Sequence, residues 1–207
     1  MARLFACLLI LLLGGCGMAV SEKPMFVAAD AAGAPAPADG IWLIRDKADC
    51  RFDEAEPMAR WPACANWAEY RDGRWFEPVG GRGPTMKPIE SDILLVGGKV
   101  ALMQIRYAEG IDGTGKYPVY FFMAFDNPAG DQKLKSIALW PVMCGTKIDY
   151  KAAAEERSAE PVVKKRYPGF DEKCRPASQK ALRSAASASR PEPSKLLRLE
   201  WMRERPD

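Results

Sequence analysis

Hydrophobic and polar residues alternate along several stretches between positions 39 and 142. Such alternation is typical of strands that bury one face. Two stretches, 67–79 and 92–108, carry the turn-forming pairs Asp72-Gly73 and Gly97-Gly98 at their centres, and each predicts a β-hairpin. Further strands are predicted at 39–46, 117–125 and 134–142.

The pattern changes after Cys144. Strong helix formers fill 149–160, a weaker set fills 178–189, and both stretches are predicted as helices. The last stretch, 196–204, alternates again and is predicted as a returning strand, with a terminal amphipathic helix as the alternative. We therefore expect a mainly β (α+β) fold: an antiparallel meander of about seven or eight strands, curled or closed into a small barrel, with one or two helices near the C-terminus.

The segment Met1-Ala2-Arg3 is short and positive, and it is followed by an apolar run from Leu4 to Leu13 and by two glycines before Cys16. These are the parts of a secretory signal peptide, and the run is too short for a permanent transmembrane helix. Leu13-Gly14-Gly15-Cys16 resembles the lipobox of bacterial lipoproteins. The resemblance implies that residues 1–15 are removed, that Cys16 is lipidated and that the lipid attaches the protein to a membrane. Because Gly17 is not aspartate, it also implies the periplasmic side of the outer membrane.

Residues 16–38 are rich in alanine and proline, without a sustained period, and predict a lipidated cysteine followed by a flexible tether. Residues 39–207 are then expected to form one periplasmic domain. The run "DKADCRFDEAEP…RWPACA" is similar to proteobacterial envelope lipoproteins of unknown function, a resemblance that brings no activity with it.

The composition of the chain argues against several functions and catalytic mechanisms. The net charge of +3 falls to +2 when residues 1–15 are removed, which argues against a nucleic-acid partner. The chain has no histidine, which excludes Ser-His-Asp and Cys-His catalysis and histidine-bound metals. Residues 110–116 match the start of a phosphate-binding loop, but Tyr117 replaces the Ser/Thr and a strand follows, so no nucleotide is expected. We predict no catalytic residues, no metal and no cofactor.

Four cysteines remain in the exported domain, namely Cys50, Cys64, Cys144 and Cys174. An even number in an oxidising compartment predicts disulfides. Three pairings exist, and locality favours Cys50–Cys64 with Cys144–Cys174. The alternative interpretation is a four-cysteine zinc site, but the sequence has no CxxC knuckle, the motif typical of such sites.

Gly40-Ile41-Trp42 resembles the Gly-x-Trp that opens the first strand of lipocalins. This resemblance implies a barrel that carries a small apolar ligand, and the candidate cavity residues are then Trp42, Tyr120, Phe122 and Trp140. The leading expectation is instead a non-enzymatic binding or assembly module of the envelope, with an envelope protein as partner. A carboxylate-based enzyme is the weakest alternative.

Overall fold

The computed structural model describes residues 17–45, 50–62, 64–79, 85–89, 92–107, 119–127, 131–149 and 162–204. Its strands are β1 (Val20–Ser21), β2 (Ala36–Pro37), β3 (Gly40–Arg45), β4 (Ala65–Arg71), β5 (Arg74–Pro78), β6 (Met86–Pro88), β7 (Asp92–Val96), β8 (Ala101–Tyr107), β9 (Val119–Asp126), β10 (Lys133–Leu134), β11 (Ser136–Pro141), β12 (Gly145–Asp149), β13 (Val162–Arg166) and β14 (Leu197–Arg203). The helices are α3 (Gln179–Ala188) and the short 3-10 turns η1 (Ala28–Ala31), η2 (Met58–Arg60) and η4 (Pro193–Lys195).

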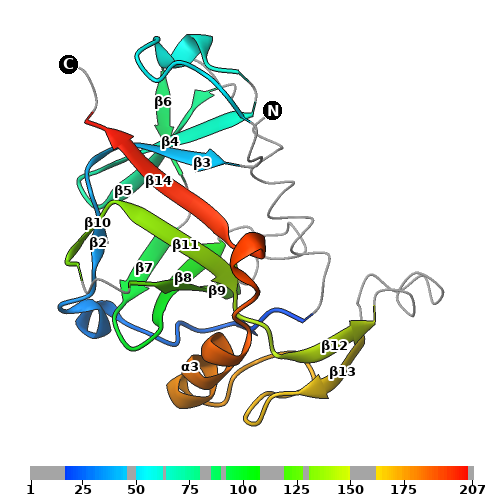
Figure 1. Ribbon diagram of the computed structural model, residues 1–207. Coiled ribbons are helices and arrows are strands. Elements are labelled where there is room, and N and C mark those ends of the chain that lie inside the picture. The colour runs from blue at the N-terminus through cyan, green and yellow to red at the C-terminus, as the bar shows by residue number, and fades with distance from the viewer. Residues whose placement is uncertain are drawn as a thin grey trace.

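One large antiparallel sheet dominates the fold (Figure 1). Its strands follow the order β6-β5-β4-β3-β14-β11-β9-β8-β7, and β1 pairs with β9 as a tenth member. The mainly β class and a helix near the C-terminus, α3, are confirmed. The expected strand count of seven or eight was too low, because short strands such as β6 carry too few residues to show a period.

The C-terminal strand β14 joins two halves of this sheet. Strands β3 to β6 form one antiparallel meander, and β7, β8, β9 and β11 form a second. Between them lies β14, with Trp201 opposite Trp42 of β3 and Leu199 opposite Ile137 of β11. The strand predicted at 196–204 is therefore confirmed, and it lies at the centre of the sheet.

The sheet is curled into a half-barrel. Its two edge strands, β6 and β7, are separated by only three residues between Pro88 and Asp92, a connection that spans at most about 14 Å. The edges of a nine-strand sheet can be that close only if the sheet bends round on itself. Within the described residues no ladder joins β6 to β7, so the half-barrel is curled rather than closed by pairing.

The concave face of the half-barrel holds the main core, here called the inner cluster. It takes alternate residues from strands of both meanders and from β14, and it includes Trp42, Ile44, Trp75, Met103, Phe121, Phe125, Ile137 and Leu199. The Trp42 indole donates to the Ala38 carbonyl over 2.8 Å and meets the Trp75 ring edge-on at 5.7 Å between centroids. Large side chains thus fill the space that the curled sheet encloses.

The convex face is covered in two places. Over β8, β9 and β11 lies α3, whose Leu182, Ala185 and Ala186 pack on Phe122 and Trp140 to form the helix-side cluster. Over β3 and β4 lies the loop closed by the first disulfide, where Trp61 packs against Ile41, Leu43 and Trp67. Where these two covers lie, the strands bury side chains on both faces: one set points to the concave side and the other lies beneath the cover.

The expected flexible tether is wrong for residues 17–38, which belong to the domain. β1 pairs with β9, β2 pairs with β10, and Phe26 of this segment is 1% exposed within the helix-side cluster. Sequence period could not reveal this, because a two-residue strand has none and its partners lie about 100 residues away.

Three local expectations can be compared with the structure. Asp72 and Gly73 both have positive φ, 50° and 75°, as a type I′ turn between β4 and β5 requires. Ser178 caps α3 by accepting from the Ala181 amide, in agreement with the helix expected at 178–189. The helix expected at 149–160 lies outside the described residues except for Asp149, which is the last residue of β12 in the β12–β13 hairpin.

Candidate functional site

The structure does not bring the four candidate cavity residues together. Trp42 belongs to the inner cluster, whereas Phe122 and Trp140 lie on the convex face in the helix-side cluster, against which Tyr120 packs. Trp140 donates its indole N–H to the Ala186 carbonyl of α3 over 2.9 Å. The expectation of a shared apolar cavity is therefore corrected: these side chains hold together two different packing layers. Alternation assigns neighbouring residues to opposite faces but does not say which face points inward.

Both disulfides have the expected pairing. Cys50–Cys64 closes the loop over β3 and β4, with 5.7 Å between Cα atoms. Cys144–Cys174 joins the end of the central sheet to the turn before α3, with 5.3 Å between Cα atoms. The second bridge lies with Val163 and Phe170 in a small cluster of its own, so it anchors the β12–β13 hairpin to the domain.

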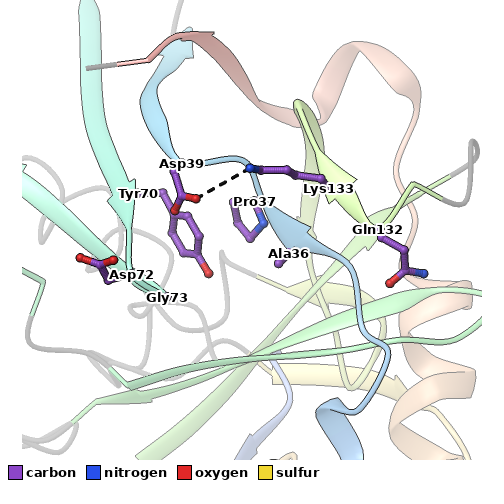
Figure 2. A pocket seen from close by; sticks show the side chains of 8 residues that line it. All are labelled: Ala36, Pro37, Asp39, Tyr70, Asp72, Gly73, Gln132 and Lys133. Atoms are coloured by element: carbon purple, nitrogen blue, oxygen red, sulfur yellow. Dashed lines mark ion pairs between the residues drawn. The ribbon is translucent and has the colours of Figure 1, made fainter. Parts of the chain in front are cut away.

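A hollow of about 480 Å³ opens between β2 and the β4–β5 turn, and we call it the turn groove (Figure 2). Figure 2 shows its lining residues, which come from β2 and the β2–β3 connection, from the end of β4 and the β4–β5 turn, and from the start of β10 with the residue before it: Ala36, Pro37, Asp39, Tyr70, Asp72, Gly73, Gln132 and Lys133. Most are small or polar. The hollow is open rather than enclosed, so it is better suited to contact another protein surface than to bury a small apolar ligand.

The charges of the turn groove are of both signs. Lys133 approaches Asp39, with 3.8 Å between Nζ and Oδ2, and both side chains are largely exposed. Burial raises the pKa of the Tyr70 hydroxyl above its usual value, and the nearby negative charge of Asp39 raises it further. Tyr70 is therefore a neutral hydroxyl at neutral pH, able to donate or accept a hydrogen bond.

Gln104 is a key residue that the sequence pattern does not single out. Its side chain is buried on the convex face of β8, where Oε1 accepts from the Met25 and Phe26 amides over 2.8 and 3.0 Å. Its Nε2 donates to the Phe26 carbonyl over 3.0 Å. The available signal was a lone amide in the otherwise apolar run Ala-Leu-Met-Gln-Ile.

Within the described ranges, no three or more Cys, Asp or Glu side chains are grouped as a metal site would require. In the same part of the chain, no helix combines the length and apolar character needed to span a bilayer. Cys16 and residues 110–116 lie outside the described residues. Comparisons with protein-family models, curated proteins and solved structures find no match for this chain.

Proposed function

We propose that this chain is an envelope lipoprotein, held by a lipid on Cys16 at the periplasmic side of the outer membrane. The motif Leu13-Gly14-Gly15-Cys16 carries this proposal. Two or more acyl chains give stable membrane attachment where one chain does not. Mass spectrometry of the N-terminal peptide from membrane-extracted protein tests it, with Cys16→Ala as the comparison. A chain that is processed normally and stays in the membrane fraction despite Cys16→Ala would refute the anchor.

The proposed role of the domain is non-enzymatic: it binds an envelope protein or supports assembly. The observation that carries this choice is the filled concave face, where Trp42, Phe125 and Ile137 are each buried completely. A carrier of the lipocalin kind needs a hollow interior at this place. The filled interior favours a rigid domain that works through its surface.

The turn groove is the part of that surface proposed to contact the partner. It is open, it combines acidic and basic side chains, and tightly held connections surround it: Trp201 donates to the Asp39 carbonyl over 2.9 Å, and Ala36 donates to the Gln132 carbonyl over 2.9 Å. A preorganised surface loses little conformational entropy when a partner binds.

Photo-crosslinking in intact cells tests this contact. A photoreactive phenylalanine analogue placed at Gln132, in the groove, should give one discrete adduct at native abundance. The same analogue at Lys180, an exposed position on α3, serves as the control. Equal labelling from both positions, or no adduct from Gln132, would contradict the groove as the partner site.

A further inference from the structure

The N-terminal segment is bound to the domain as far as the first described residue. The Gly17 carbonyl accepts from the Cys144 amide over 2.6 Å, and the Ala19 amide donates to the Val142 carbonyl over 2.7 Å. Between these bonds, Met18 forms a bridge with Met143 and is 8% exposed. Gly17 is therefore part of the folded domain, beside the second disulfide.

This attachment determines how far the domain could move away from a lipid on Cys16 and how freely it could rotate. One peptide unit, about 3.8 Å between Cα atoms, joins Cys16 to Gly17. A coil of some twenty residues would instead allow about 25 Å of reach and free rotation. With so short a connection, the surface around Gly17 must stay at the membrane.

That surface surrounds the junction of β11 and β12. The β12–β13 hairpin projects from the domain on this side (Figure 1), with Gly145 opposite Arg166 and Thr146 opposite Lys165. The turn that precedes α3 is bonded to the same place, because the Val20 amide donates to the Cys174 carbonyl over 3.1 Å. We call this surface the attachment face: it lies around the buried Gly17 and Cys144, and its exposed side chains include Lys165, Arg166 and Lys173.

The exposed side chains of the attachment face are charged rather than apolar. Lys165, Arg166 and Lys173 are all exposed, and no ion pair engages them within the described residues. One exposed acid, Glu172, lies among them, and its carbonyl accepts from the Arg166 guanidinium over 3.4 Å. The acids nearby are partly neutralised: Arg175 bonds Asp171 at 2.6 Å and Glu22 at 3.1 Å.

Large exposed hydrophobic side chains in the described part of the chain are Val27 and Val79, neither of which belongs to this face. Such a surface can rest on lipid headgroups, whose phosphates attract Lys and Arg, but it has no side chains to insert among acyl chains.

We propose that the domain lies directly on the bilayer through its attachment face, in one fixed orientation, with the β12–β13 hairpin and the turn before α3 against the headgroups. This inference rests on the lipid anchor proposed above. The turn groove lies on a different side of the half-barrel, beside β2 and β10 (Figure 1), and in this orientation it faces the periplasm.

Lysine footprinting on reconstituted protein tests the orientation. The lipidated full mature chain is added to preformed vesicles of phosphatidylethanolamine and phosphatidylglycerol and treated with a membrane-impermeant amine reagent. Mass spectrometry then gives the reaction rate at each lysine. The matched control inserts a flexible Gly/Ser linker of about twenty residues between Cys16 and Gly17, which keeps the lipid and the fold but restores rotational freedom.

We expect Lys165 and Lys173 to react severalfold more slowly in the parent chain than in the linker variant, while Lys133, in the turn groove, reacts equally in both. Equal rates at Lys165 and Lys173 in the two lipidated proteins would overturn the fixed orientation and leave the anchor intact. An N-terminal peptide that carries no lipid on Cys16 would instead refute the proposed anchor itself, and the same spectra report it.

Discussion

Replacing Gln104 with leucine should release the N-terminal segment from the sheet. Leucine keeps most of the side-chain volume but can neither accept from the Met25 and Phe26 amides nor donate to the Phe26 carbonyl. Gln104 is 4% exposed and Phe26 1%, so water cannot replace these partners while the segment stays in place. Two outcomes then compete, and they determine how much free energy of unfolding is lost.

If the segment stays docked, each unpaired buried backbone group costs about 1–3 kcal/mol. If it detaches, the backbone groups are hydrated, but the burial of Phe26, about 1.5–3 kcal/mol, is lost together with that of its neighbours. The outcome with the smaller free-energy cost determines the measured destabilisation. We therefore expect Gln104→Leu to lower the free energy of unfolding by about 2–4 kcal/mol.

Gln104→Glu gives a sharper comparison. A carboxylate still accepts from both amides but faces the Phe26 carbonyl without a proton to donate, and its burial raises its folded-state pKa above the unfolded value of about 4.3. The protonated acid can make all three bonds. Because the folded-state pKa is raised, this stabilisation is fully present below about pH 4.3 and is lost as pH rises through the folded-state pKa.

Urea unfolding of the mature chain, followed by tryptophan fluorescence, measures the free energy, and hydrogen exchange at the Met25 and Phe26 amides measures local release. Gln132→Leu, at an exposed glutamine, is the control and should change stability by less than about 0.5 kcal/mol. A loss below about 1 kcal/mol for Gln104→Leu, or unchanged exchange at both amides, would refute the idea that Gln104 holds the segment.

Two further outcomes follow from single contacts. Gly145→Ala should destabilise the chain by several kcal/mol in urea unfolding, because a Cβ there would overlap the Lys165 carbonyl. The control is Gly33→Ala, where a Cβ has nothing within 4 Å but φ is 71°, and it should cost only about 1 kcal/mol. Equal losses of stability in the two variants would contradict the steric reason. Burial alone would raise the pKa of Asp171, but hydrogen bonds from Arg175 outweigh it and lower the pKa. Asp171 should thus add stability above its unfolded pKa, lost as pH falls through the lower folded-state pKa; NMR titration in Arg175→Ala should show the pKa return upward, and no change would count against the pair.

The sequence by itself determined the elements whose causes are local. The Asp72-Gly73 turn follows from two residues that tolerate positive φ, and α3 follows from Ser178 as a cap before good helix formers. The long strands of the two meanders follow from alternation, and the disulfide pairing follows from chain locality. Each of these depends on interactions between residues near one another in the chain, so a single sequence contains the necessary information.

Only the tertiary structure decided the faces of the strands, the central place of β14 and the fate of residues 17–38. Trp42 and Phe122 have similar patterns around them, yet they face opposite sides of the curled sheet, because register with distant strands sets the inward face. Residues 17–38 have the composition of a coil, and as an isolated peptide they would gain too little to fold. Gln104, nearly 80 positions from Phe26, and the distant strands β9 and β10 supply the hydrogen bonds that order them, and partners at such distances leave no local pattern in the chain.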